Sequence, residues 1–407
     1  FSANDNIPPY MFMGVITSMF FGLMVSSEEI VKDRRILKRE SFLNLSWLSY
    51  LNSKIMIMFM LSAVQTFSFV LIGNMILGIK GMTFSYWLVL FTTSCSANIL
   101  GLNISSAFNS VITIYILIPF IIIPQLLFSG VMVKYDKLHI GRYSTREFVP
   151  VIGDLMTARW SFEALAVRQF KDNKYEKNFI EHDIEESQNN YYASFLINDL
   201  LSDLQASGRI MDDSDSSDDL EGNFARLNYH IDELSQLAGI YPGSWKDSLN
   251  MEYFNPKLSN EVANYLNSLK HRFIQLKKRA SALRDSTTES LIESLGRDGL
   301  VELKDNYVNS WLTELVLDRP TLNASYKTFD RIIQKYEPGF MKPTSKYGRA
   351  HFYAPVKKAG NWEIDTYWFN LIIIWIVSVL LYIALYYKFL QRFVTFYGDF
   401  RIKPSEK

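Results

Sequence analysis

Four long stretches of this sequence contain no Asp, Glu, Lys or Arg: residues 6–27, 55–79, 81–133 and 366–387. A helix needs about 20 apolar residues to cross the hydrocarbon core of a bilayer. Runs of 22, 25, 53 and 22 residues therefore predict one, one, two and one crossings. The alternative is a soluble protein with buried helices, but these runs are longer than the helices of typical globular proteins.

The 53-residue run is expected to break at "SSAFNS" (105–110), which is polar and built from small residues. Five membrane-spanning helices are therefore predicted, at about 8–26, 50–77, 83–106, 111–131 and 366–387. The segment between the fourth and fifth spans reads as a charged soluble domain. The chain has 42 basic and 42 acidic residues, so its net charge does not predict a nucleic-acid partner. The single cysteine, Cys95, excludes an intramolecular disulfide, and a large external segment without cysteine favours a bacterial envelope.

Short connections rich in Lys and Arg lie in the cytoplasm. Residues 28–54 and the tail after residue 387 carry most of the basic residues that flank the spans, whereas the turn at 78–82 carries only Lys80. Five spans with these connections place 28–54, the turn at 105–110 and the C-terminus in the cytoplasm. The N-terminus and residues 132–365 are then external, in the periplasm of a bacterial inner membrane.

A dense charged cluster, "EEIVKDRRILKRE" (28–40), follows the first span directly and carries four acids beside five bases. It can be read as an orientation signal that touches lipid headgroups. A mixture of both signs suits a protein partner better than an anionic lipid surface.

Several segments together are similar to one family. They are the first span with the charged cluster, "YLNSKIMIMFMLSAVQTFSFVLIGNMILGIK", "SCSANILGLNISSAFNSVITIYILIPFIIIPQLLFSGVMV" and "GDLMTARWSFEALAVRQF". The sequence resembles the membrane domain of G-subfamily ATP-binding-cassette exporters over residues 8–170 and the last span. In that family a nucleotide-binding domain precedes six spans. This chain has five spans, no G-x-x-x-x-G-K-[ST] motif and begins with Phe1. The ATPase, with its ATP and Mg, is thus expected upstream in the same polypeptide or in a separate subunit.

The resemblance also assigns roles to individual residues. The charged segment 28–49 would contact the nucleotide-binding domain and transmit its ATP-driven closure, with coupling positions at Glu28, Asp33, Arg34, Arg39 and Glu40. The substrate cavity would lie between two copies of the membrane domain, and an apolar pair after "FSG" would close it outward. That gate falls on Val131 and Met132. For these two, interfacial packing at the end of a span is the alternative.

Cavity-lining positions follow from the same resemblance and from helical spacing. On the first span they are Met13, Ile16, Met19 and Phe20, and on the fourth they are Pro119 and Pro124, which should kink the helix. An aromatic residue that clamps flat ligands in the family corresponds here to Ile16, which argues against planar substrates. Polar residues of the third predicted span are expected to join helices by hydrogen bonds.

Residues 171–360 exceed the family's usual external loop. Apolar residues recur there at heptad-like steps of four and three from Leu258 to Leu283 and from Phe224 to Ala238, and a third apolar stripe runs from Leu300 to Leu315. The expected fold is an all-α membrane protein with a large external helical domain before the last span. Its predicted parts are residues 1–133 with four spans, 134–170 as an external re-entrant segment, 171–362 as the outer domain and 363–407 as the last span and tail.

Neither metal-ligand spacing nor a hydrolase motif is present. The favoured function is the membrane part of a dimeric ATP-driven exporter that moves a hydrophobic or amphipathic molecule, such as a lipid, outward. The outer domain would dock an envelope partner. The alternative is mechanical: ATP hydrolysis would move the outer helices to act on that partner, with no substrate crossing. A third hypothesis is a receptor or scaffold without an ATPase.

Overall fold

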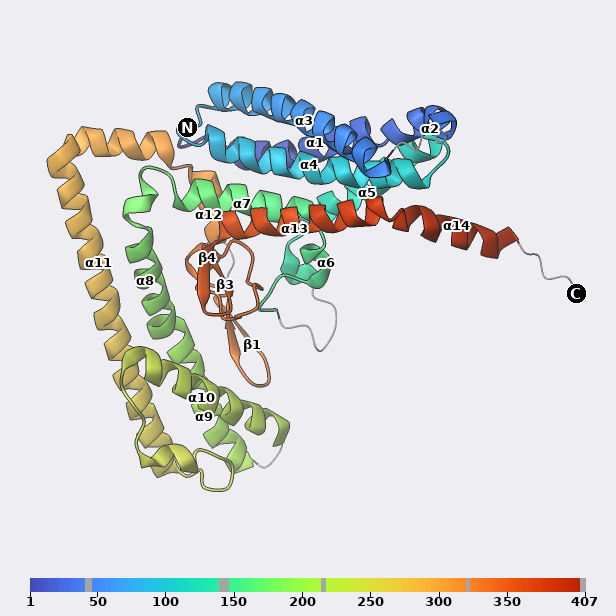
Figure 1. Ribbon diagram of the computed structural model, residues 1–407. Coiled ribbons are helices and arrows are strands. Elements are labelled where there is room, and N and C mark those ends of the chain that lie inside the picture. Colours follow the sequence, from blue (N-terminus) through green and yellow to red (C-terminus); the bar gives the residue numbers. More distant parts are fainter. Residues whose placement is uncertain (41–45, 139–145, 214–216, 320–322, 403–407) are drawn as a thin grey trace, which may run out of the picture. The chain divides into compact units, whose positions relative to one another are not determined.

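The computed structural model describes residues 1–40, 46–138, 146–213, 217–319 and 323–402. It is mostly helical (Figure 1) and divides into two compact units. The membrane unit comprises Phe1–Asn173, Asp305–Leu312 and Pro343–Lys407. The helical unit comprises Lys174–Lys304 and Thr313–Lys342. The predicted domain bounds, which fall at other residues, stay predictions.

Four helices of the membrane unit are long and apolar enough to cross a bilayer: α1 (Ile7–Ser26), α3 (Trp47–Leu77), α4 (Thr83–Ala107) and α13 (Thr366–Tyr386). These four agree with predicted spans. The fifth prediction, at 111–131, corresponds to the shorter apolar helix α5 (Val111–Leu127). At 1.5 Å per residue its 17 residues extend about 25 Å, less than a hydrocarbon core of about 30 Å. Its crossing of the membrane stays a prediction.

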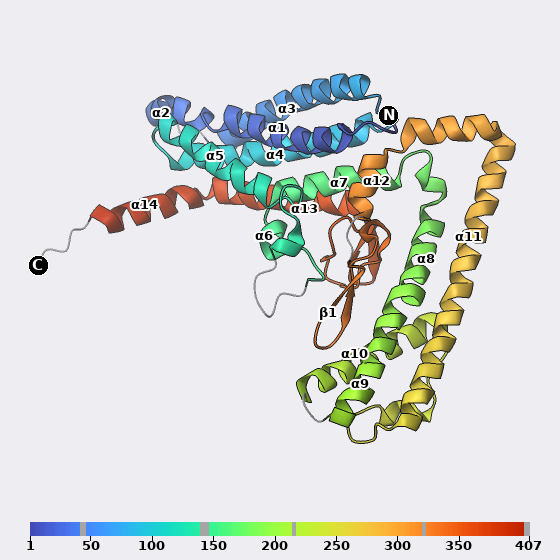
Figure 2. The same ribbon diagram turned by 180° about the vertical axis from the view of Figure 1, so that it is seen from behind.

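Helix α4 is the centre of the membrane unit. It packs against α1, α3, α13 and α7 (Thr157–Lys171), and these helices run side by side in both views (Figures 1 and 2). The polar side chains of α4 bridge its neighbours: Asn98 donates to Ser62 Oγ at 2.7 Å, and Asn103 donates to the Leu381 carbonyl at 2.9 Å. The expected role of these residues as contacts between helices is confirmed.

Two glycines allow α1 and α4 to approach closely. A Cβ atom on Gly22 would lie 2.8 Å from the Ser94 carbonyl oxygen and 2.9 Å from Ala97 Cβ. A Cβ atom on Gly101 would lie 2.0 Å from Ser26 Oγ. The two helices therefore leave no room for a Cβ atom at either glycine, a close approach that small residues permit in membrane helix pairs.

The other helices near the membrane unit's ends are α2 (Glu29–Glu40), α6 (Val151–Asp154) and α14 (Phe389–Ile402). Short 3-10 turns occupy Tyr135–Lys137, Glu176–Asn178, Ser244–Ser248 and Pro338–Phe340. The connections that are predicted to lie on the same side of the membrane are close to one another in the membrane unit. Arg34 of α2 bonds the Phe108 carbonyl after α4, and the Lys388 ammonium lies 4.3 Å from the Trp47 ring centroid.

The helical unit is built on α8 (Ile180–Tyr191), a π-helical turn (Tyr192–Leu196), α9 (Ile197–Asp213), α10 (Ser217–Ala238) and most of α11 (Pro256–Tyr307). The predicted apolar stripes form its core, with Leu227 and Ile231 of α10 and Val262 and Leu269 of α11 fully buried. The third predicted stripe is split, because α11 ends at Tyr307 and α12 (Ser310–Leu317) begins a new helix.

The fold is not purely helical, and the all-α expectation is wrong in this detail. In the helical unit β1 (Ser325–Lys327) pairs antiparallel with β2 (Ile332–Gln334), with Tyr326 opposite Ile333. In the membrane unit β3 (Val356–Ala359) pairs antiparallel with β4 (Trp362–Asp365), around Gly360 at φ 65°. A turn requiring a left-handed residue explains the glycine. This second hairpin leads directly into α13.

Candidate coupling site and translocation path

The charged helix α2 begins on the end of α4. The backbone N–H groups of Ile30 and Val31 donate to Ser105 Oγ at 3.0 and 3.1 Å. The first N–H groups of a helix have no partner within the helix. A serine of another helix supplies the missing acceptor here, so the start of α2 is fixed to α4.

Arg34 makes the second attachment. Its guanidinium donates to the carbonyl oxygens of Ser106 and Phe108 at 3.1 Å each, and to that of Ser105 at 3.5 Å. These carbonyls close the C-terminal end of α4, where unsatisfied acceptors and the helix dipole favour a cation. Arg34 is therefore half-buried, with its guanidinium directed at the end of α4.

A third attachment joins α2 to α3. The Lys54 ammonium lies 2.8 Å from Glu29 Oε2 and 2.7 Å from Asp33 Oδ2. The Tyr50 hydroxyl also donates to Asp33 Oδ2, at 3.0 Å. One lysine between two carboxylates, with a tyrosine on one of them, fixes the angle between the two helices.

The predicted coupling residues fall into two groups. Asp33 and Arg34 lie inside the attachment network, whereas Glu28 pairs with Lys32 within the charged segment and Arg39 is exposed. Glu40 is the last residue of α2, and its side chain lies outside the described part of the chain. Sequence reasoning missed the partners Tyr50 and Lys54, whereas Ser105 belongs to the polar residues that were expected to join helices.

The predicted cavity residues of α1 differ in solvent exposure. Met13 and Phe20 are 53% and 38% exposed, while Ile16 and Met19 are 7% and 2% exposed. Ile16 and Met19 therefore pack inside the membrane unit, and of the four predicted residues Met13 and Phe20 are the accessible ones.

On α5 the two predicted prolines lie inside the helix. Pro119 is exposed and Pro124 is half-buried. The predicted gate follows α5: Val131 is half-buried, its N–H donating to Ser129 Oγ at 3.3 Å, and Met132 is 61% exposed. The two gate residues therefore lie next to each other just past the helix end, with Met132 more accessible.

Sequence analysis missed a buried ionic cluster around α7. Lys357 of β3 and Glu163 of α7 are both 0% exposed, and Lys357 Nζ lies 2.6 Å from Glu163 Oε2. Asn370 of α13 accepts from Lys357 at 2.8 Å and donates to Glu163 at 2.8 Å. Arg159 Nη1 lies 3.6 Å from Glu163 Oε2.

Desolvation and the nearby Arg159 guanidinium lower the pKa of Lys357 to about 7. The cluster joins the predicted re-entrant segment to the last span. Arg159 and Glu163 lie in the segment that carries the family resemblance, but nothing in the sequence around Lys357 indicates a buried charge.

Comparison with known families and structures gives one match. Residues 2–169 match the model of a family described as ABC-2 type transporter. No curated protein and no solved structure matches the chain. The matched region contains α1 to α6, including the charged helix α2, and nearly all of α7. The match supports an ABC-2 type transporter membrane domain over residues 2–169, and the four long apolar helices support a multi-pass membrane protein.

Proposed function

We propose that the chain forms the membrane part of an ATP-driven exporter of the G-subfamily kind, which works as a dimer and moves a hydrophobic or amphipathic molecule outward. A nucleotide-binding domain, in the same polypeptide or a separate subunit, would supply ATP hydrolysis with Mg. In this proposal residues 28–54 face the cytoplasm of a bacterial cell and the helical unit faces the periplasm.

The attachment of α2 to two membrane helices is the observation that carries this proposal. A helix that receives force must hold its position relative to the helices that it moves. Three contacts meet that need: Ser105 at the start of α2, Arg34 on the end of α4 and Lys54 from α3. A displacement of α2 would reach α4, which packs against most of the membrane helices.

Within this proposal the coupling residues have two different tasks. Asp33 and Arg34 anchor α2 to the membrane unit, since their partners belong to α3 and α4. The exposed Arg39 belongs to the surface that a nucleotide-binding domain would contact. Charges at such a boundary fix its geometry more than its affinity.

The substrate path would lie between two copies, along the exposed faces of α1 and α5, which pack against each other. Apolar side chains cover these faces, including Met13 and Phe20 on α1 and Ile116 and Phe120 on α5. An apolar lining suits a lipid-like cargo, and Val131 and Met132 would form the outward gate.

The test measures ATP hydrolysis by the complete transporter in lipid nanodiscs and in detergent. Arg34→Gln removes the charge at the end of α4, so lipid-stimulated hydrolysis should fall about tenfold, the effect of one charged hydrogen bond. Arg34→Lys keeps the charge and should restore most of the stimulation. Arg209→Gln, on the exposed side of α9, is the control. Normal stimulation in Arg34→Gln would show that α2 is not the coupling element.

One observation favours the mechanical alternative as a second candidate. The Asn309 side chain donates to the carbonyl oxygens of Phe1 and Asn4 at 2.9 and 2.8 Å, and the Ser310 N–H donates to Ser2 O at 3.0 Å. Motion of α1 would therefore reach the segment from which the chain returns to the helical unit. If ATP is hydrolysed while lipid transfer across sealed proteoliposomes stays at the level of empty liposomes, the mechanical function replaces the exporter.

A further inference from the structure

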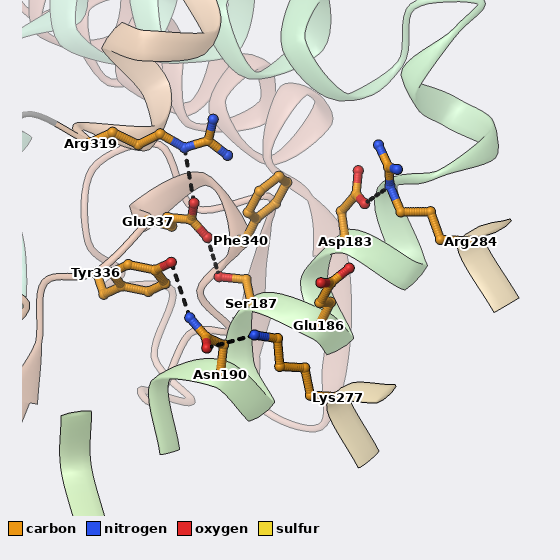
Figure 3. Close-up of a pocket in the computed structure, with 10 residues that line it drawn as sticks. All are labelled: Asp183, Glu186, Ser187, Asn190, Lys277, Arg284, Arg319, Tyr336, Glu337 and Phe340. Atoms are coloured by element: carbon orange, nitrogen blue, oxygen red, sulfur yellow. Dashed lines mark hydrogen bonds and ion pairs between the residues drawn. The ribbon is translucent and has the colours of Figure 1, made fainter. Parts of the chain in front are cut away.

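The helical unit contains a polar cavity of about 380 Å³. Figure 3 shows the residues that line it, which come from four segments: α8, α11, Arg319 just after α12, and the stretch from Tyr336 to Phe340. Ten residues line it, of which three are acidic and three are basic: Asp183, Glu186, Ser187, Asn190, Lys277, Arg284, Arg319, Tyr336, Glu337 and Phe340. Its size lies at the lower end of the range for small-molecule sites.

Helical spacing explains why these side chains share one space. Asp183, Ser187 and Asn190 follow each other at steps of four and three on α8, so they lie on one face. Lys277 and Arg284 are seven residues apart on α11 and also share a face. The two faces meet where Arg284 Nε lies 2.6 Å from Asp183 Oδ1 and Lys277 Nζ lies 3.0 Å from Asn190 Oδ1.

Glu337 fixes the position of Arg319 and of its own segment in the wall of the cavity. Its backbone has φ 47° in the left-handed region, which is unfavourable for a residue with a side chain, and the residue is 8% exposed. Both carboxylate oxygens are used: Oε2 accepts from the Ser187 hydroxyl at 2.6 Å and Oε1 accepts from Arg319 Nε at 3.0 Å. A strained and fully bonded carboxylate thus holds Arg319 at the cavity.

Each arginine donates to its carboxylate partner through Nε, and the Arg284 guanidinium also lies 5.3 Å from the Phe179 ring centroid. Among the described residues, none accepts a hydrogen bond from the terminal amino groups of Arg284 or Arg319. In Figure 3 the terminal amino groups of Arg319 lie on the side away from Glu337. Lys277 has one acceptor, Asn190, for its three donors. The cavity therefore offers cationic donors that remain available to a ligand.

The charges of the wall divide into two ion pairs and one separated pair. Arg284 pairs with Asp183, and Arg319 pairs with Glu337. Lys277 and Glu186 remain. Glu186 forms no hydrogen bond or ion pair with any residue that the structure describes. One cation and one anion are thus left without a counter-ion, and the lining as a whole is neutral.

We propose that this cavity binds a small zwitterion. The anionic oxygens of the ligand would lie against Lys277 and the terminal amino groups of the arginines, which match carboxylate and phosphate geometry. The ammonium group of the ligand would lie against Glu186. A free amino acid, a dipeptide or a phosphoethanolamine headgroup presents this pair of charges. The inference does not rest on the transport function.

Binding to the full chain in nanodiscs made from uncharged lipid is measured by equilibrium dialysis with radiolabelled probes. The probes are glycylglycine, phosphoethanolamine and inorganic phosphate. We expect saturable binding of at least one zwitterion at or below about 1 mM. Preference for glycylglycine identifies an amino-acid or peptide ligand, and preference for phosphoethanolamine identifies a headgroup.

Adjacent residues provide matched controls. Lys277→Met and Glu186→Gln should each weaken zwitterion binding about tenfold, since each removes one charged contact. Lys278→Met and Glu185→Gln change exposed neighbours on the same helices and should leave the affinity unchanged. For inorganic phosphate, which lacks an ammonium group, Glu186→Gln should not weaken binding.

Two results would overturn the proposal. One is the absence of saturable binding for both zwitterions at millimolar concentration in a wild-type chain whose thermal unfolding is cooperative. The other is a loss of affinity in the control variants as large as in Lys277→Met and Glu186→Gln.

Discussion

The side chains of Lys357 and Glu163 form the most deeply buried ion pair in the described part of the chain. A charge without a partner at such a site is strongly destabilising, and the pair is tolerated because each member has further contacts. The Lys357 ammonium also lies 4.5 Å from the Trp160 ring centroid, where an aromatic face attracts a cation. Lys357, Glu163 and Asn370 thus tie β3, α7 and α13 together.

The lowered pKa of Lys357 predicts a pH-dependent stability. Its pKa is about 7 in the folded protein and 10.5 in the unfolded chain. Between these values the unfolded state binds more protons, so Lys357 should make the protein more stable as pH rises from about 7 toward 10. The charged groups facing it are Glu163, Arg159 and Asp154.

Thermal unfolding in detergent from pH 6 to 10 tests this expectation. Other groups titrate in this range, including Glu176, whose pKa burial raises to about 7. The difference between wild type and Lys357→Met isolates the effect of Lys357, and Lys358→Met, which alters a more exposed neighbour, is the control. The midpoint of Lys357→Met should depend less on pH above 7. An unchanged slope would show that Lys357 keeps its ordinary pKa.

Single residues show where sequence reasoning stops. Arg34 was predicted as a coupling position because the charged cluster is local in sequence and carried a family resemblance. Lys357 could not be predicted, because its burial depends on Glu163, 194 positions away, and on Asn370. Long-range partners decide whether a lysine is buried, and no local pattern encodes them.

Among the secondary-structure elements, the helices were the predictable part. Charge-free length identified α1, α3, α4 and α13, and heptad spacing identified α10 and the first part of α11. The hairpins β1–β2 and β3–β4 were missed, since strands of three or four residues carry too little alternation to be recognised. The split between α11 and α12 was missed because the apolar stripe continues across Val308 and Asn309.

The close packing of α1 on α4 gives a prediction for these elements. Gly22→Ala places a methyl group 2.8 Å from the Ser94 carbonyl, which is backbone and cannot rotate away. We expect a loss of about 1–3 kcal/mol in the free energy of unfolding, as for other overpacked sites. Denaturant titration followed by tryptophan fluorescence measures it.

Gly14→Ala is the control on the same helix. Its new methyl group would lie 3.2 Å from Phe69 Cε1, a side-chain atom that can shift. Its cost should therefore be smaller than that of Gly22→Ala. Equal costs in the two variants would mean that helix propensity or general crowding, not the α1–α4 contact, determines the result.

At the scale of the whole molecule, the chain interleaves two units, and the helical unit is inserted between α7 and α13. The distribution of basic residues predicts that the charged helix α2 and the helical unit lie on opposite sides of the membrane. The native Cys95 is fully buried, so a cysteine introduced at the surface can be labelled with little background.

Labelling with a membrane-impermeant maleimide in intact spheroplasts tests the sidedness. Lys278→Cys in the helical unit should react before lysis, whereas Arg39→Cys on α2 should react only after lysis. Both positions are exposed, so a difference in reactivity reports their side and not their burial. The reverse pattern would contradict the orientation derived from the basic connections.

The contact between α1 and α4 has a consequence for motion. Because even a Cβ atom at Gly22 or Gly101 would clash with the facing helix, we expect these two helices not to slide past each other by a turn. Helices α1 and α4 would move together as one rigid body. A displacement of α2, which is attached to α4 at Ser105, would then be transmitted to the N-terminal end of α1. There the carbonyl oxygens of Phe1 and Asn4 accept hydrogen bonds from Asn309.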